Sequence, residues 1–444
     1  MNKLTTFLLT IVMTIPFMSS GSTNRINFVE YDLPNGLHVI LHQDNTTPIV
    51  NVSILYHVGS KNEIEGRSGF AHFFEHLMFE GSENIARGDY FKITMNAGGE
   101  LNAYTSQDKT YYYEILPSNQ LELGLWLESE RLLHLRIDSV GLETQRAVVK
   151  EERSQRFDNQ PYGSILEKTM ANAYTVHPYR WTPIGNPVDI NEATLDEFID
   201  FHSMYYVPNN ATLTIAGDID IEETKKLVEK YFGDIPRGTK PIYRPNVVEP
   251  QQTAEVREIV YDNIQLPAVV MSYHIPEQGS EDFYALSMLT TLLSSGQSSR
   301  FSKSIVNDQQ LALQCVSFPM PTEDPGLYMI LGIVNMGVDP DTLEKAIEAE
   351  IEKVQKEIVS EKEFTKLRNK IENDFVTRNS TMAGIAENLS NYHVFFGDAN
   401  LINTELDRYM KVTPEDMKRV ANKYLVPENR VVLTYLPKQN EKEE

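Results

Sequence analysis

The sequence predicts an α+β protein built from two similar halves. The chain has 444 residues, which is too long for one ordinary hydrophobic core, so we expect at least two domains. Each half opens with short β-like runs and continues with amphipathic helical segments. Between the halves, four prolines and one glycine lie within residues 234–254, and this segment shows neither helical nor strand periodicity. We therefore expect domains at 25–235 and 255–440, joined by a linker at 236–254.

The first half begins with three β-like runs. The pair Asn35-Gly36 separates the runs 29–33 and 37–42, and Asn-Gly between alternating runs is a strong hairpin signal. A third run follows at 50–58, and residues 98–116 read as two more strands. Helical periodicity then predicts helices at 121–135, 140–157, 194–205 and 221–232, with a loop and strand at 207–218 before the last of them.

The second half repeats this outline. Strands are expected at 258–261 and 268–274, followed by a helix at 282–293 and a strand-like run at 326–337. Helices are expected at 341–360, 361–377 and 413–424, and a last strand at 430–435. This repetition is the reason for expecting two halves of the same kind.

Composition limits the possible functions. There are 63 acidic and 40 basic residues, a formal net charge of −23, which argues against binding to nucleic acid or to anionic membrane surfaces. Apolar residues make up 41% and charged residues 23%, as in soluble globular proteins. The single cysteine, Cys315, excludes an intrachain disulfide framework and cysteine-based zinc sites. Any metal must therefore be held by histidines and carboxylates.

The first 21 residues have the pattern of a secretory signal peptide. Lys3 provides a positive start, residues 4–17 form an apolar run, and Ser19-Ser20-Gly21 supply small residues for cleavage. The run is short for a membrane span and is followed by polar sequence, although an uncleaved anchor remains the alternative. We expect an exported protein, periplasmic or secreted.

One motif, H-x-x-E-H, carries the chemistry. His72, Glu75 and His76 lie within the apolar, helix-forming run 69–79. On a helix His72 and His76 project from one face, and two neutral imidazoles at that spacing suit a zinc ion. Glu75 points to the edge of the same face, where a carboxylate can reach a metal-bound water as a general base. The alternative is a solvated polar stripe, but the surrounding phenylalanines favour a buried helix, and this order of residues is typical of inverzincins.

A third protein ligand is expected in the segment 147–156. This segment and the motif resemble the M16 metallopeptidases, the pitrilysin or insulinase family, which includes the processing peptidase β subunit. In that family H-x-x-E-H is followed roughly 75 residues later by a zinc-binding Glu in a V-V-x-x-E helix, and Glu152 matches it 76 residues after His76. Its neighbour Glu151 is expected to face solvent. Many members carry a further Glu seven residues before the ligand, but here that position is Gln145.

The resemblance covers nearly all of the chain after residue 21. It implies two mostly antiparallel sheets flanked by helices, the M16 or LuxS–metallohydrolase-like fold, with the second half catalytically degenerate. It also implies that the strand holding Asn102 and Ala103 is an edge that binds the peptide backbone of the substrate, with an ordinary aromatic hairpin as the alternative. His57, at a strand end, and His177, in an H-P-Y turn, are interpreted as structural residues.

The second half departs from the pattern of self-sufficient members. These carry an Arg and a Tyr seven residues apart that hold the substrate and polarise the scissile carbonyl. Alignment on Leu311-Ala312 places Val306 and Leu313 at these positions, and neither side chain can donate a hydrogen bond. By resemblance to two-chain M16 enzymes, we expect a homologous partner subunit that supplies the Arg and Tyr. The rival interpretation is a chain that works alone with weak activity.

The sequence is thus interpreted as a zinc-dependent endopeptidase that acts on unfolded or short peptides. His72, His76 and Glu152 would bind Zn²⁺, and Glu75 would activate the zinc-bound water. The alternative is a non-catalytic assembly or binding subunit of an M16-like complex. Such subunits usually lose their zinc residues, so the intact set favours the enzyme.

Overall fold

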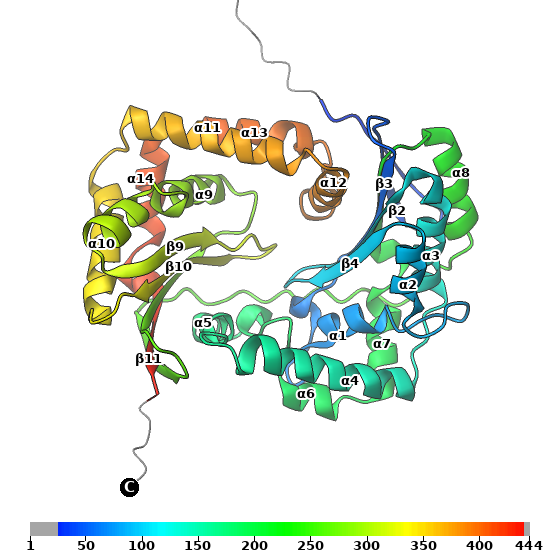
Figure 1. The fold of residues 1–444 in the computed structure, drawn as a ribbon, viewed down its shortest axis with the longest axis horizontal. Coiled ribbons are helices and arrows are strands. Elements are labelled where there is room, and N and C mark those ends of the chain that lie inside the picture. Colours follow the sequence, from blue (N-terminus) through cyan, green and yellow to red (C-terminus); the bar gives the residue numbers. More distant parts are fainter. Residues whose placement is uncertain (1–24, 439–444) are drawn as a thin grey trace, which may run out of the picture.

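The computed structural model describes residues 25–438, and the expected signal peptide at 1–21 lies outside this range. The described chain forms two sheets, each with its own set of helices, and the halves lie side by side with their edge strands toward each other (Figure 1). The expected α+β class with two similar, mostly antiparallel halves is confirmed. Within residues 25–438, none of the helices has the length and apolar character needed to cross a bilayer.

The first sheet has six strands in the order β1-β2-β6-β3-β5-β4. Neighbouring strands are antiparallel except for β2 and β6. The Asn35-Gly36 turn joins β1 and β2, and Gly36 adopts a φ of +89°, which glycine tolerates without strain. The strands are β1 Val29–Asp32, β2 His38–Gln43, β3 Ile49–Tyr56, β4 Glu100–Thr105, β5 Thr110–Pro117 and β6 Ala211–Gly217.

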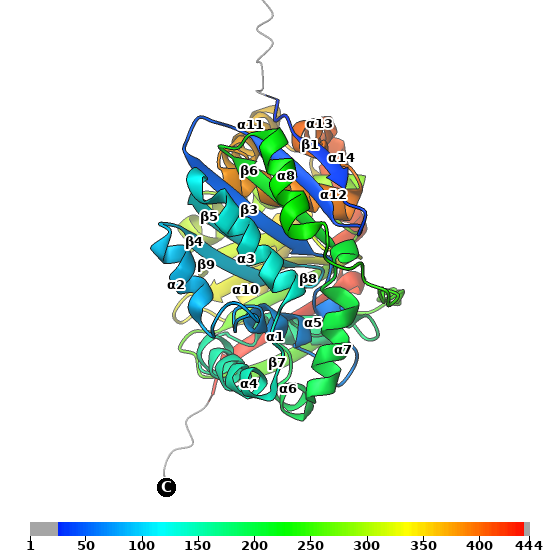
Figure 2. The ribbon, with the colours of Figure 1, turned by 90° about the vertical axis from the view of Figure 1, so that its right-hand side faces the viewer.

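Helices of the first half cover one face of this sheet and one end of it. Helices α3 and α8 pack against β3, β5 and β2, while α1, α4 and α7 cluster below the end of the sheet (Figures 1 and 2). The helices are α1 Phe70–Leu77, α2 Asp89–Asn96, α3 Leu121–Leu133, α4 Ser139–Arg153, α5 Ile165–Ala173, α6 Pro187–Glu192, α7 Leu195–Tyr205 and α8 Ile221–Phe232.

No helix or strand occurs between α8 and the next strand at Val256. This segment is nevertheless fixed by hydrogen bonds along its length. The carbonyl of Tyr243 accepts from Asn62 and Tyr205, and the carboxylate of Glu249 accepts from the backbone amides of Thr175, Val176 and His177. The connection between the halves therefore follows a defined path over the first half.

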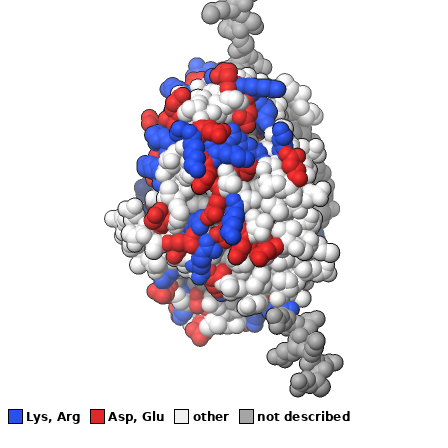
Figure 3. Space-filling model, turned by 90° about the vertical axis from the view of Figure 1, so that its left-hand side faces the viewer, with Lys and Arg blue, Asp and Glu red and all other residues white. Residues whose placement is uncertain are grey.

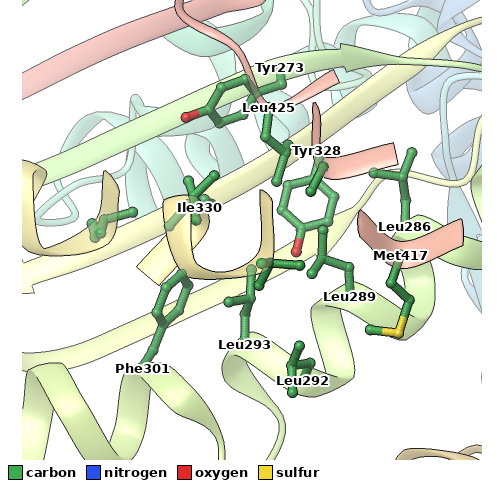
Figure 4. Close-up of a cluster of buried hydrophobic side chains, with 14 of the residues drawn as sticks. Tyr273, Leu286, Leu289, Leu292, Leu293, Phe301, Tyr328, Ile330, Met417 and Leu425 are labelled. Atoms are coloured by element: carbon green, nitrogen blue, oxygen red, sulfur yellow. The ribbon is translucent and has the colours of Figure 1, made fainter. Parts of the chain in front are cut away.

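The second sheet has five strands in the order β7-β11-β8-β10-β9, with only β7 and β11 parallel. Its main core lies between the sheet and α9, α10 and α14, where the side chains of Leu289, Tyr328 and Met417 are buried together (Figure 4). The elements are β7 Val256–Asp262, β8 Ala268–Ile275, α9 Glu281–Ser294, β9 Ala312–Pro319, β10 Gly326–Val334, α10 Pro340–Lys356, α11 Glu361–Arg378, α12 Met382–Phe396, α13 Leu401–Lys411, α14 Pro414–Tyr424 and β11 Arg430–Pro437.

Each half places one helix on the sheet of the other half. Helix α5 lies on the second sheet, where Met170 packs with Val270 and Leu433. Helix α12 lies on the first sheet, where Leu389 packs with Ile40 (Figure 1). Because each sheet buries its inner face under a helix from the other half, the two halves hold each other in place.

A buried polar cluster adds to this contact. The ammonium of Lys61 lies 3.2 Å from Asp108 in the first half and 2.5 and 3.1 Å from Glu323 and Asp324 in the β9–β10 loop of the second. His57 Nε2 lies 3.0 Å from Glu323. Burial alone would raise the pKa of Glu323, but the hydrogen bond from His57 and the charge of Lys61 lower it to about 2.

On the outer face of the second half, acidic and basic side chains are interspersed (Figure 3). Neighbouring residues on α10 form ion pairs, including Lys353 with Glu350 and Lys356 with Glu352. This face is thus a solvated surface of mixed charge.

Candidate metal centre

The two histidines of the motif lie one turn apart on α1. Their ring centroids are 4.8 Å apart, and the planes are at 75°. Glu152, near the end of α4, points at them, with its Oε2 3.0 Å from His76 Nε2 and 3.6 Å from His72 Nε2. One ligand atom from each of the three side chains lies within 4.8 Å of the other two.

This donor set fits a zinc ion. The buried Oε2 of Glu152 has no hydrogen-bond partner among the described residues, although the other oxygen is paired with Arg156 at 2.7 Å. A buried carboxylate oxygen beside two imidazole nitrogens requires a cation or protons between them. Two nitrogens and one oxygen are the protein ligands of many catalytic zinc sites, which leave the fourth position open.

The protonation states also favour metal binding. Burial, together with the neighbouring His76, lowers the pKa of His72 to about 4. The imidazole of His76, 3.0 Å away, and the charges of the surrounding groups lower the pKa of Glu152 against the opposing effect of burial. Both groups are therefore unprotonated at neutral pH, which is the form that binds a metal.

Glu75 lies beside this group but points to the edge strand. Its Oε2 accepts a hydrogen bond of 2.6 Å from the hydroxyl of Thr105 at the end of β4. Burial raises the pKa of Glu75, and the Thr105 hydrogen bond opposes this rise. Glu75 is thus held in one orientation between α1 and β4, with the other carboxylate oxygen unused by this bond.

The N-terminus of α1 is fixed by a carboxylate, Glu63, that no motif in the sequence singles out. Glu63 is buried, and its two oxygens accept from the amides of Gly69 and Ala71 at 2.8 and 2.9 Å. This satisfies free amides of the first turn at the positive end of the helix. The backbones of Gly69 and Gly185 also touch here: a Cβ on Gly185 would lie 2.4 Å from Gly69 Cα, and Gly185 has a φ of +70°.

The C-terminus of α1 is fixed by a fully buried arginine. Arg131 Nε donates to the carbonyl of Met78 at 3.3 Å, and the guanidinium is paired with Glu114 and Glu128, which are also fully buried. The guanidinium lies over three aromatic rings, those of Phe79, Tyr90 and Tyr112. The signal in the sequence was the run Glu128-Ser-Glu-Arg131 inside a helix whose other residues are mostly apolar.

The apolar face of α1 explains its phenylalanines. Phe70 stacks on Phe198 of α7 at 4.4 Å between centroids, and Phe74 packs against Phe201 and Tyr206. The residues that surround the histidines are therefore core residues. They bury one side of the helix and leave His72 and His76 on the other.

Asn102 and Ala103 lie on β4, the edge of the first sheet next to α1. The Asn102 side chain is exposed, and its Oδ1 accepts from the amide of Ala103 at 2.9 Å. A cavity of about 760 Å³ lies between the halves beside the end of β4, lined by Tyr104 and Ser106 on either side of Thr105. It is lined from both sides, among others by Tyr104 and Lys109 of the first half and Phe318 and Glu387 of the second.

Comparison with known proteins identifies the family. The family described as Insulinase (Peptidase family M16) matches residues 38–186, and the one described as Peptidase M16 inactive domain matches residues 192–371. The chain belongs to peptidase family M16. It is 33% identical over 395 residues to a zinc protease, PqqE, of Helicobacter pylori, covering 88% of this chain and 89% of that one.

Two further M16 proteins show how far the likeness extends. The mitochondrial-processing peptidase subunit beta of Blastocladiella emersonii is 25% identical over 415 residues, 91% of this chain and 88% of that one. The crystal structure of a protease from Helicobacter pylori superposes with a TM-score of 0.89 at 31% identity, covering 93% of this chain and all of that one. The M16 fold thus extends over both halves.

The remaining residues that the sequence singled out lie in the following surroundings. Gln145 Nε2 donates to Glu80 Oε1 at 2.5 Å, so its amide pairs with a buried carboxylate. Glu151 is exposed. Val306 packs against the second core, whereas Leu313 on β9 is 57% exposed. His57 and His177 contact Glu323 and Asp324, acidic residues of the β9–β10 loop, and neither histidine belongs to the metal group.

Proposed function

We propose that the chain is a zinc-dependent endopeptidase. The observation that supports this most directly is the convergence of His72, His76 and Glu152 beside a separately held Glu75. His72, His76 and Glu152 would hold the zinc, and zinc bound there would acidify a water molecule and polarise the peptide carbonyl. The chain that follows the signal-like segment would form two domains, at 25–235 and 255–440, with 236–254 as the linker.

Glu75 would carry the proton. Its Oε2 is hydrogen-bonded to Thr105, so the proton of the attacking water would pass to Oε1 and from there to the leaving amine. Thr105 would act as a positioning residue, because its hydroxyl fixes the plane of the carboxylate. The raised pKa of Glu75 brings the base closer to neutrality, where proton transfer in both directions is efficient.

The substrate would be an unfolded or short peptide. The edge strand β4 offers unpaired backbone groups to an extended chain, and Asn102 and Ala103 lie in this strand. The cavity of about 760 Å³ between the halves begins at Tyr104 of the same strand and could hold part of an extended peptide.

A partner subunit is part of the proposal. Val306 and Leu313 stand where self-sufficient members are expected to carry an Arg and a Tyr, and neither side chain can stabilise the developing oxyanion. A homologous chain without H-x-x-E-H would supply these groups in a heterodimer. The signal-like segment at 1–21 supports action outside the cytoplasm, in the periplasm or after secretion.

Hydrolysis of a quenched fluorogenic peptide tests this function. The mature chain would be assayed alone and mixed with a homologous chain lacking the motif, with the zinc content measured in each sample. We expect activity in the mixture that Glu152→Gln abolishes and that Glu151→Gln, the adjacent exposed carboxylate, leaves unchanged. Full activity of the chain alone would refute the partner requirement. Bound zinc without hydrolysis in either sample would favour the non-catalytic assembly subunit.

A further inference from the structure

A second group of metal-ligand side chains lies where the halves meet, away from the H-x-x-E-H motif. Glu30 on β1, His38 on β2 and His393 on α12 each bring one ligand atom within 4.8 Å of the others. Helix α12 lies against this part of the first sheet in both ribbon views (Figures 1 and 2). The group therefore joins the first sheet to a helix of the second half.

The strand register explains why three of the side chains face α12. Asp32 lies directly opposite His38 in the β1–β2 pair, and Glu30 is two residues before Asp32 on the same strand. Residues two apart on a strand share a face, so Glu30, Asp32 and His38 project to the same side. Two residues after His38, Ile40 is buried against α12, which shows that this side faces the helix.

The hydrogen bonds of His38 set its tautomer. Its Nδ1 lies 2.8 Å from Asp32 Oδ1, and a carboxylate oxygen can only accept, so Nδ1 carries the proton. In the neutral ring Nε2 then has a free lone pair. That nitrogen is buried, has no hydrogen-bond partner in residues 25–438, and lies 3.4 Å from Glu30 Oε2. Two lone pairs facing each other need a cation or a proton between them, and a metal ion is the cation that could also reach His393.

The same arrangement is common around protein-bound metals. A ligating histidine usually donates its other ring N–H to a carboxylate, which fixes the ring and makes the ligating nitrogen more basic. Asp32, His38 and the unpaired Nε2 have this relation. The ring of His393 is stacked on that of His38, with centroids 3.4 Å apart and planes at 5°, and adds a second imidazole.

We propose that Glu30, His38 and His393 form a second site for a divalent transition-metal ion such as zinc, with Asp32 orienting His38. Two imidazoles and a carboxylate suit zinc and its neighbours in the first row, and disfavour calcium and magnesium, which prefer all-oxygen sites. The lone pairs of the two stacked rings lie in nearly parallel planes, so one ring would have to turn toward the shared ion on binding.

Such an ion would act on the contact between the halves. His38 belongs to the first sheet and His393 to a helix of the second half, so one ion bonded to both ties the halves together. Glu30 is partly exposed, with 42% of its side chain accessible, which gives an ion access from solvent. Binding would therefore raise the stability of the assembled two-half structure.

The test separates this site from the first one. In the full-length mature chain, His72→Gln and His76→Gln remove the first site, and zinc alone is titrated into the chelator-stripped protein. We expect about one zinc per chain and a higher melting temperature. Adding His393→Gln should abolish both effects, and Asp32→Asn should weaken binding roughly 10–100-fold. His134→Gln, which removes an isolated histidine 3.3 Å from Glu83, is the matched control and should change neither.

Two results would overturn the proposal. One is the absence of bound zinc in the background variant at a tenfold excess of the ion. The other is zinc binding that His393→Gln and Asp32→Asn leave unchanged. Asp32 is exposed, so its variant should fold normally and keep the test decisive even if the His393 substitution disturbs the packing of α12.

Discussion

Replacing Arg131 with methionine should destabilise the first half strongly. Arg131, Glu114 and Glu128 are fully buried, and the arginine is the positive member of this triad. Removal leaves two buried carboxyl groups without their countercharge. Breaking a buried pair from one side typically costs about 3–5 kcal/mol. For a unit of roughly 200 residues, each kcal/mol lowers the melting temperature by about 2–4 °C, so we expect a decrease of roughly 6–20 °C.

The assay is thermal denaturation followed by near-ultraviolet circular dichroism, with chelator present so that metal binding does not shift the transition. The control is the triple variant Arg131→Met, Glu114→Leu and Glu128→Met. Apolar replacement of a whole buried triad is often close to neutral, so most of the loss should be recovered. The triple variant should remain about 1 kcal/mol less stable than the parent protein, because the Met78 carbonyl loses the hydrogen bond that Arg131 Nε donates. A single variant within 2 °C of the parent, or a triple variant no better than the single one, would refute this reasoning.

Four further predictions concern the contact between the halves, the core and the N-terminus of α1. Lys61→Met should cost about 3 kcal/mol in unfolding free energy, since it removes the buried ammonium that three carboxylates share; an unchanged melting temperature would contradict this. The pKa of Glu323 is about 2, below its unfolded value, so its stabilisation is complete above about pH 4.5 and is lost as pH falls toward 2. In Glu323→Gln the melting temperature should therefore depend less on pH in that window than in the parent protein. The same pH dependence in both proteins would contradict this. Burial raises the pKa of Cys315, so a thiol reagent should modify it only on unfolding, and rapid native labelling would exclude this placement. Gly185→Ala should lower zinc affinity, because its Cβ would displace Gly69 at the start of α1. Unchanged affinity would show that the backbone accommodates the Cβ without moving α1.

The sequence predicted what depends on local pattern. Helix α1 and its two histidines follow from a spacing within five residues, and the hairpin of β1 and β2 follows from Asn35-Gly36. Periodicity also located α8 and α14, whose apolar and polar faces are distinct. In these segments the fold and the local preference agree.

Contacts between distant segments were not predictable from one sequence. Glu63 and Arg131 fix the two ends of α1 from outside the motif. Nothing around Glu63 indicates this, and the charged run around Arg131 does not indicate which segment the arginine contacts. Helices α2, α5, α6, α12 and α13 were not predicted. Helix α12 is apolar on several sides because it packs against both halves, which weakens its amphipathic period. Strand β9 was missed because this edge strand exposes Leu313 and Phe318, against the usual alternation.

The second metal group shows the same limit. Asp32 and His38 are close in sequence, but His393 is more than 350 positions further on and reaches them only through the exchange of α12 onto the first sheet. A lone histidine in a helix carries no ligand signal by itself. Only the fold places the two imidazoles face to face.

The central claim is that three side chains hold a zinc ion while Glu75 performs the proton transfer. Glu75→Gln tests it most directly, with zinc content and peptide hydrolysis measured on the same sample of the active assembly. The account predicts unchanged zinc content and a loss of turnover of about 10²-fold or more. A variant that hydrolyses the peptide at the parent rate, or one that loses the metal together with the activity, would contradict the separation of these roles.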